Sequence, residues 1–256
     1  MNNLVHHGRG AVFNPKNKFS IAQLTKLYPE GIDDFEESLP RTAFFSDSSK
    51  SIISRNASPD IPFDLSVNPY QGCEHGCVYC YARDSHQYWG YGSGIDFESK
   101  IIIKHNAAEL LERSFLNPSW KVEPIMLSGN TDPYQPAEKK FKLTQKILET
   151  CLKYRNPVSI ITKNSLILRD LVVLKELAAY GLVQVMITIT TLNESLRRNL
   201  EPRTATSTKR LKVVEQLAEA GIPVGVMIAP VIPSLNMNEI PKLVDEAATS
   251  AGAAVG

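Results

Sequence analysis

Three cysteines, Cys73, Cys77 and Cys80, stand within eight residues of one another in this chain of 256 residues. Gaps of three and two residues leave no room for a strand or a long loop, so the backbone must turn tightly and direct the sulfurs to one point. Gly72 and Gly76 fit such a turn, because glycine adopts positive φ without steric cost. The spacing therefore predicts a metal site.

The number of sulfurs indicates which metal. Three thiolates are one fewer than the four that usually hold a [4Fe–4S] cluster, which would leave one iron open for chemistry. A structural zinc site needs four ligands, and the remaining cysteine, Cys151, stands alone far along the chain. Zinc with help from His75, a disulfide and inert core thiols remain alternatives. Compact cysteine triplets in reducing compartments favour metal binding, and here an iron–sulfur cluster.

Composition limits the class of protein. With 43% hydrophobic residues the chain can bury one substantial core, and α/β barrels of this length are commonly a single domain. A net charge of +1 gives no overall attraction to nucleic acid or to a membrane surface. No apolar run approaches the roughly 20 residues of a membrane span, and no signal-peptide core is present. We expect a cytoplasmic protein without a membrane partner.

From residue 63 onward, short β-branched runs alternate with amphipathic stretches, which is typical of a parallel sheet with helical crossovers. Gly181 and Gly221 follow two of the expected helices and are predicted to end them. Cys151 falls on an apolar helical stripe and is predicted to be a core residue. Strands are expected at 63–67, 100–104, 123–128, 157–162, 183–190 and 223–230. Helices are expected at 107–115, 139–154, 168–180, 207–220 and 238–250.

Residues 1–62 are polar and rich in turn-forming residues. We interpret them as an extended N-terminal arm that packs on the barrel, with a short helix near 21–27 and a strand-like stretch at 51–54. Arg9, Lys16 and Lys18 are interpreted as solvated, with phosphate contact as the alternative; His6 and His7 are likewise interpreted as solvated. Residues 63–256 are predicted to form the core.

The cysteine triplet, with Tyr79 just before its last member, resembles the signature of the radical S-adenosylmethionine (SAM) superfamily. The longer string from Asn68 to Arg83 and the stretch from Leu127 to Pro136 are similar to its spore-photoproduct-lyase-like branch, whose members are often labelled DNA repair photolyases. The resemblance extends over residues 8–252. It implies an α/β fold, a partial (β/α)6 TIM-like barrel with the cluster loop after the first strand. Relatives carry a sixth strand, so we expect the C-terminal end to be truncated.

The resemblance also implies cofactors and roles. Cys73, Cys77 and Cys80 are expected to bind a [4Fe–4S] cluster that cleaves SAM reductively into methionine and a 5′-deoxyadenosyl radical. An external donor such as flavodoxin or ferredoxin is expected to supply the electron. The expected SAM contacts are Tyr79 at the adenine; Asn130, Thr131 and Asp132 at the amino group; Lys163 at the carboxylate or ribose; Arg203 at the carboxylate; and Thr190.

Each of these contacts has a structural alternative. Residues 130–132 also fit a plain turn before proline, and threonine is common in strands, which is a sufficient reason for Thr190. Arg203 is equally compatible with the surface. Tyr81 matches a tyrosine that follows the third cysteine in the lyases and is a candidate to relay hydrogen, with core packing as its alternative.

One position departs from the lyase pattern. The lyases place a hydrogen-donating cysteine where this chain has Gly129, and glycine has no thiol to donate. This argues against repair of the thymine photoproduct by that mechanism. The expected activity is therefore radical SAM chemistry on an unknown substrate, with nucleic acid as one candidate. The alternative is a non-catalytic iron–sulfur redox or sensor protein.

Overall fold

The computed structural model describes residues 8–11, 13–15, 17–18, 41–61, 63–127 and 129–252. Its larger sheet has six strands in the order β2-β3-β6-β7-β8-β9. At one edge β2 pairs antiparallel with β3, and the other strands run parallel. The strands are β2 (Ile53–Arg55), β3 (Leu65–Val67), β6 (Ile125–Leu127), β7 (Val158–Thr162), β8 (Val183–Thr188) and β9 (Val224–Met227).

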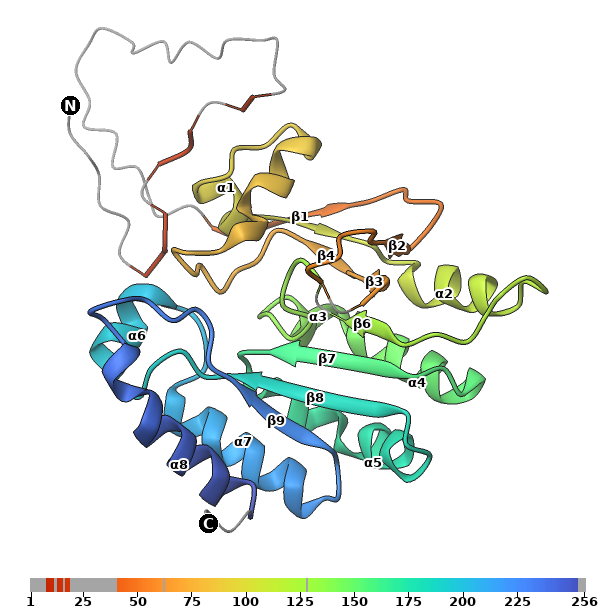
Figure 1. Ribbon diagram of the computed structural model, residues 1–256. Coiled ribbons are helices and arrows are strands. Elements are labelled where there is room, and N and C mark those ends of the chain that lie inside the picture. Colours follow the sequence, from red (N-terminus) through yellow and green to blue (C-terminus); the bar gives the residue numbers. More distant parts are fainter. Residues whose placement is uncertain are drawn as a thin grey trace, which may run out of the picture.

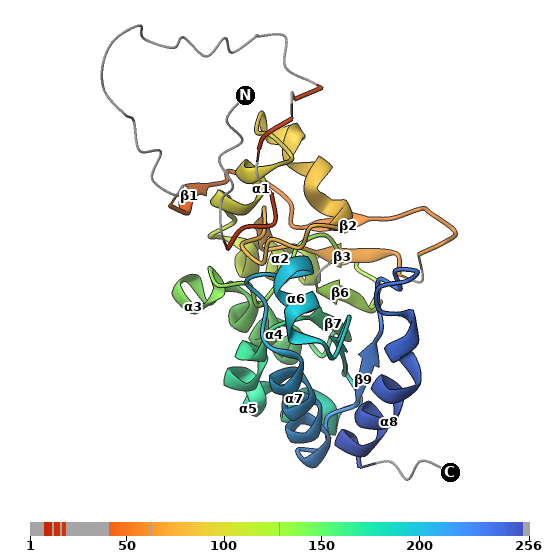
Figure 2. The same ribbon diagram turned by 90° about the vertical axis from the view of Figure 1, so that its left-hand side faces the viewer.

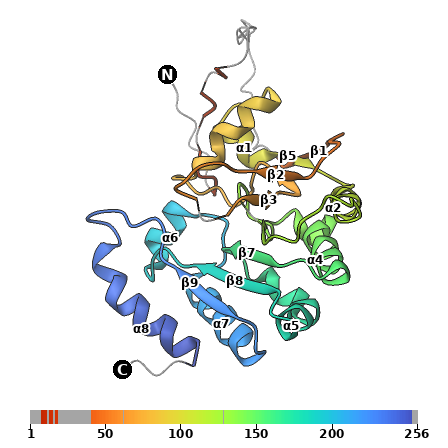
Figure 3. The same ribbon diagram turned by 45° about the vertical axis from the view of Figure 1, so that its right-hand side comes forward.

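Helices cover the outer side of this sheet. Figures 1 and 3 show the sheet curving, with the helices along its convex face and its edges β2 and β9 apart. This arrangement matches the predicted partial TIM-like α/β barrel. None of the described helices is long and apolar enough to cross a membrane. The covering helices are α2 (Ala107–Phe115), α4 (Leu143–Tyr154), α5 (Leu171–Ala179), α7 (Ser207–Glu219) and α8 (Ile240–Ser250).

The main hydrophobic core lies between the sheet and these helices. Each fully buried Leu or Ile side chain contributes roughly 1.5–3 kcal/mol to folding. Cys151 belongs to this core and is fully buried, as predicted. Core members from the strands and helices include Leu65, Ile125, Ile160, Val185, Ile187, Leu148, Leu174 and Leu217.

A smaller three-stranded sheet with the order β1-β5-β4 sits above the barrel. It consists of β1 (Ala43–Ser46), β5 (Lys100–Ile103) and β4 (Tyr70–Gln71). The 3-10 helix η1 (Tyr81–Trp89) and α1 (Ile95–Ser99) complete this layer, which Figure 2 shows at the top of the molecule. The chain thus passes from β4 into the cysteines and from them into η1.

The structure corrects some predicted boundaries. The helix expected at 139–154 is divided into α3 (Glu138–Phe141) and α4 by Lys142, whose φ is 53°. The buried carboxylate of Glu138 accepts hydrogen bonds from the amides of Thr144 and Gln145, so it caps α4 where the sequence suggested a continuous helix. The helix expected at 168–180 begins earlier as η2 (Ser165–Asp170), and α6 (Glu194–Leu200) and η3 (Met237–Glu239) were not predicted.

Other local predictions are confirmed. Gly181 and Gly221 have φ values of 66° and 73° and follow the ends of α5 and α7. The strand-like stretch at 51–54 overlaps β2, which begins two residues later than expected. The helix expected near 21–27 and the residues His6, His7 and Lys16 lie outside the described residues.

The interpretation of Arg9 as solvated was wrong. Its guanidinium donates to the backbone carbonyl of Glu98 at 2.6 Å and to the Thr42 hydroxyl at 3.3 Å. Lys18, by contrast, has a side chain that is 58% exposed and pairs with Asp84 at 3.7 Å. The sequence did not predict the Arg9 contacts because its partner lies 89 residues away along the chain.

Candidate active site

The carboxyl ends of the parallel strands meet residues 72–80, here called the cysteine loop, around a cavity of about 340 Å³. This is the face on which β/α barrels gather reactive groups. The cavity is lined by the following residues predicted from the sequence: Cys73, Cys77, Tyr79, Cys80, Tyr81, Asn130, Thr131, Asp132 and Lys163. Its walls also contain His75, Ile161, Thr162, Thr188, Met227, Ala229 and Pro230.

The backbone of the cysteine loop is held at several points. The amide of Cys73 donates to the carbonyl of Phe97 at 2.8 Å, and that of Val78 donates to the carbonyl of Leu200 at 3.0 Å. Gly72 and Gly76 have φ values of 78° and 70°, which confirms the tight turn expected there. Tertiary contacts therefore fix the direction of the loop.

The three thiols are free and mostly buried. Burial raises the pKa of Cys77 to about 12, with the Glu201 carboxylate adding to the effect, and burial likewise raises the pKa of Cys73 and of Cys80. Because a bound metal takes thiolates, binding here must release protons. In the described part of the chain, no three Cys, His, Asp or Glu side chains lie close enough for a single metal ion. The three cysteine ligands of a [4Fe–4S] cluster bind three different iron atoms, so they lie further apart than the ligands of a single ion.

Asp132 is engaged by the protein itself. Its carboxylate accepts hydrogen bonds from the Thr162 hydroxyl at 2.7 Å and from the amide of Lys163 at 2.8 Å, and it lies 3.4 Å from Nδ1 of His75. Burial alone would raise the pKa of Asp132, but His75 and these hydrogen bonds lower it below its usual value. His75 also pairs through Nε2 with Asn164 at 3.1 Å. Asp132 and His75 thus tie the cysteine loop to the end of β7.

Asn130 and Thr131 also have protein partners. The Asn130 side chain donates to Gln71 at 2.9 Å and to Ser85 at 3.0 Å. The Thr131 hydroxyl donates to the backbone carbonyl of Tyr70 at 2.8 Å. Both amides donate to the side chain of Asn68, so this segment is held firmly at the cavity wall.

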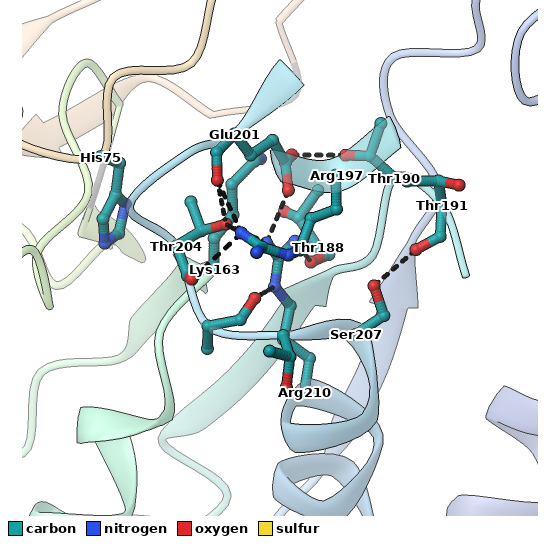
Figure 4. A network of polar contacts seen from close by, with 12 residues as sticks. His75, Lys163, Thr188, Thr190, Thr191, Arg197, Glu201, Thr204, Ser207 and Arg210 are labelled. Atoms are coloured by element: carbon teal, nitrogen blue, oxygen red, sulfur yellow. Dashed lines mark hydrogen bonds and ion pairs between the residues drawn. The ribbon is translucent and has the colours of Figure 1, made fainter. Parts of the chain in front are cut away.

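A buried charged network lies behind Tyr79. Figure 4 shows Glu201 between Thr190 and Arg210. Glu201 accepts hydrogen bonds from Thr190 at 2.6 Å and from Arg210 at 2.5 Å, and it also accepts from the Tyr79 hydroxyl. Glu201 and Arg210 are 0% and 1% exposed. Sequence reasoning missed Glu201, because a single carboxylate in an irregular segment carries no pattern.

Two polar groups face the cavity without protein partners. Oγ1 of Thr188 is buried and has no hydrogen-bond partner among the described residues. The ammonium of Lys163 has none in the same part of the chain, and its charge acts on Cys77, Cys80 and Glu201. A buried hydroxyl without a partner is costly. This donor set fits a thiolate-bound cluster beside a ligand that bears anionic and hydroxyl groups.

Thr190 and Arg203 do not line the cavity. Thr190 is buried in the Glu201 network. The guanidinium of Arg203 lies 3.3 Å from Glu74, and its backbone amide donates to the carbonyl of His75 at 3.2 Å. These contacts place both residues around the cysteine loop rather than at the ligand space.

Tyr81 lies at the cavity wall and is 78% exposed, so packing in the core is excluded as its role. Its hydroxyl donates to the backbone carbonyl of Gly129 at 2.8 Å. A Cβ atom added at Gly129 would lie only 2.9 Å from Cβ of Ser66, so a thiol at this position would require a shift of β3. The chain therefore has a phenol, and no thiol, at this point of the wall.

His86, in the 3-10 helix that follows the cysteine loop, makes the stability of the folded protein depend on pH. It is fully buried beside the rings of Tyr91 and Phe97, and neither ring nitrogen has a hydrogen-bond partner among the described residues. Burial lowers the pKa of His86 from 6.5 to about 4. Between pH 4 and pH 6.5, the imidazole of His86 is therefore protonated in the unfolded chain and neutral in the native protein. The contribution of the neutral His86 to the free energy of unfolding is fully present above pH 6.5. It is lost as the pH falls toward 4, and the loss amounts to at most about 3 kcal/mol.

We expect His86→Phe to weaken this acid destabilisation, measured as the difference in unfolding free energy between pH 7 and pH 4.5. His105→Gln is the control, because His105 is exposed. Equal pH dependence in the wild type and His86→Phe would contradict the assignment.

Comparisons with known proteins agree with this geometry. A family model described as the radical SAM superfamily matches residues 67–247. The uncharacterized protein Rv2578c of Mycobacterium tuberculosis H37Rv is 38% identical over 175 residues, which cover 68% of this chain and 52% of that protein. The uncharacterized protein MJ0683 of Methanocaldococcus jannaschii is 34% identical over 169 residues, covering 66% and 61%. The chain thus spans about half the length of the mycobacterial relative.

Among solved structures, spore photoproduct lyase complexed with dinucleoside spore photoproduct shares the fold. The TM-score is 0.62 at 15% sequence identity, over 81% of this chain and 57% of that one.

Proposed function

This chain belongs to the radical SAM superfamily, and we propose that it binds a [4Fe–4S] cluster through Cys73, Cys77 and Cys80 and SAM in the adjoining cavity. The observation that carries the proposal is the convergence of three free cysteines on one cavity that Lys163 and Thr188 also line, where the buried Thr188 hydroxyl has no hydrogen-bond partner among the described residues. A cluster held by these three cysteines would supply reductive cleavage of SAM to methionine and a 5′-deoxyadenosyl radical, with the electron coming from a flavodoxin- or ferredoxin-like donor.

The side chains have distinct proposed roles. Lys163 and Thr188 bind the carboxylate and hydroxyl groups of SAM, because both residues line the cavity and neither side chain has a hydrogen-bond partner in the described part of the chain. Tyr79 lines the cavity and contacts the adenine of SAM, while its hydroxyl donates a hydrogen bond to Glu201. The backbone of residues 130–132 receives the SAM amino group. The side chains of Asp132 and Thr190 act as positioning groups, because their polar atoms are directed to protein partners, and Arg203 acts in the same way through the contact of one guanidinium nitrogen with Glu74.

Tyr81 is the proposed contact with the substrate. It stands at the wall of the cavity with most of its ring exposed, and a phenol O–H is able to give a hydrogen atom. Spore photoproduct lyase, which shares the fold, has been solved with a dinucleoside spore photoproduct. We therefore propose a nucleic-acid component as the substrate class. Gly129 supplies no thiol, so we expect the outcome of the reaction to differ from thiol-dependent repair.

The test uses anaerobically reconstituted and reduced protein incubated with SAM. We expect 5′-deoxyadenosine and methionine in equal amounts. An unchanged SAM pool in protein that carries the cluster would overturn the proposal and favour the alternative, a non-catalytic iron–sulfur redox or sensor protein.

A further inference from the structure

A short piece of the N-terminal arm, residues 8–11, packs against the cysteine loop. We call it the arm segment. A Cβ atom added at Gly10 would lie 1.7 Å from the backbone oxygen of Gly76, and one added at Gly76 would lie 3.2 Å from the amide nitrogen of Gly10. The two backbones are therefore in direct contact, and this approach requires glycine at position 10.

A single buried carboxylate holds the arm segment in place. Glu98 is 0% exposed. Its oxygens accept hydrogen bonds from the amides of Gly10 at 3.0 Å and Ala11 at 2.8 Å. They also pair with Arg83 at 2.6 Å, and the Arg83 guanidinium donates to the backbone carbonyl of Cys77 at 2.8 Å. Glu98 thus connects the arm segment to the backbone of a predicted cluster ligand.

A second connection runs through Arg9. Its guanidinium donates to the backbone carbonyl of Glu98 and to the Thr42 hydroxyl. Thr42 in turn donates to Glu74, the residue after Cys73, at 2.8 Å. The arm segment is thereby connected to the cysteine loop at two places, Glu74 and the backbone of Gly76 and Cys77. None of its residues lines the cavity, so its contacts act on the backbone that carries the sulfurs.

The energetics favour a docked arm. A buried carboxylate is costly unless hydrogen bonds satisfy it, and hydrogen bonds to charged groups are among the stronger ones. Without the arm segment, Glu98 would keep Arg83 but lose two amide donors. The main hydrophobic core contains no residue of the arm segment, so we expect its release to loosen the cysteine loop and leave the barrel folded.

We propose that the arm segment is a positioning element of the cluster site: docked on Glu98, it holds the cysteine loop in the shape that presents three sulfurs to one cavity. The effect of the arm segment on cluster binding rests on the proposed function. Its effect on the conformation of the cysteine loop is independent of that function.

The test compares Gly10→Ala and Glu98→Gln with the wild type as metal-free full-length chains. Alkylation of each cysteine by iodoacetamide is followed by mass spectrometry. We expect Cys73 and Cys77 to react about tenfold faster or more in both variants. Fewer hydrogen bonds and packing contacts then hold the cysteine loop closed, so the loop opens more often and exposes its thiols. Cys151, buried in the main core, is expected to react at the wild-type rate and serves as the internal reference.

Glu112→Gln is the matched control, since Glu112 is a carboxylate that pairs with the exposed Lys153, outside both the arm segment and the cysteine loop. Its Cys73 and Cys77 should react as in the wild type. After reconstitution, Gly10→Ala and Glu98→Gln should also lose iron in air several-fold faster. Unchanged alkylation of the loop cysteines, or equal acceleration at Cys151, would overturn the inference. A wild type that binds no iron would overturn only the proposed function, because the alkylation test needs no metal.

Discussion

Cys77→Ala is expected to abolish stable cluster binding, whereas Cys151→Ala is expected to retain it. A cluster bound by three cysteines loses one of its ligands in the first variant. No further thiol of the described residues lines the cavity to replace it. Cys151 is fully buried in the core between the sheet and the helices, away from the cavity. Iron and sulfide analysis of anaerobically reconstituted protein, with its visible absorption, provides the measurement.

The pair of variants separates ligation from stability. Both substitutions remove a buried thiol, so a general loss of packing would affect both proteins. If only Cys77→Ala loses its iron while both unfold at similar temperatures, Cys77 is a ligand. Full iron content in Cys77→Ala would show that the cluster binds elsewhere, or that the chain takes a different metal.

The order of strands and helices could be predicted because its signals are local and repetitive. β-branched runs gave β7 and β8, and Gly181 and Gly221 marked two helix ends. The cysteine loop could be predicted for the same reason, since its residues are adjacent in sequence. The break at Lys142 could not, because it depends on Glu138 reaching forward to cap the next helix.

The supporting groups of the site could not be predicted. Glu98 and Glu201 are isolated carboxylates on short segments, and they meet the cysteine loop and the arm through contacts between residues far apart in the chain, such as the 122 residues from Tyr79 to Glu201. Arg203 follows β8, as many ligand-binding residues do, but its chain segment passes beside the cysteine loop and directs the guanidinium to Glu74. Charge pairing of this kind has no period in the sequence.

Glu201→Ala is expected to lower the free energy of unfolding by about 3–5 kcal/mol, because it leaves the Arg210 guanidinium buried without its carboxylate. Arg210 is 1% exposed, and its remaining partners are neutral oxygens, including the backbone carbonyl of Thr188 at 2.8 Å. The same substitution removes the carboxylate acceptor of the Tyr79 and Thr190 hydroxyls, which keep only their contact with each other at 3.3 Å and that of Thr190 with the Ala229 carbonyl at 3.1 Å. Urea unfolding of the metal-free protein measures the change.

Two further variants identify the cause. Glu112→Ala breaks the ion pair with Lys153, whose side chain is 65% exposed, and is expected to change the free energy of unfolding little. Glu201→Leu combined with Arg210→Met removes both buried charges and should recover a substantial part of the loss. Because the Tyr79 hydroxyl still loses its carboxylate acceptor in the double variant, we expect the reconstituted cluster of this variant to be less stable in air than that of the wild type. If the double variant recovers its free energy of unfolding and its cluster is as stable in air as that of the wild type, Glu201 supports only the fold. If Glu112→Ala and Glu201→Ala lower the free energy of unfolding equally, the assignment of a stabilising buried ion pair is wrong.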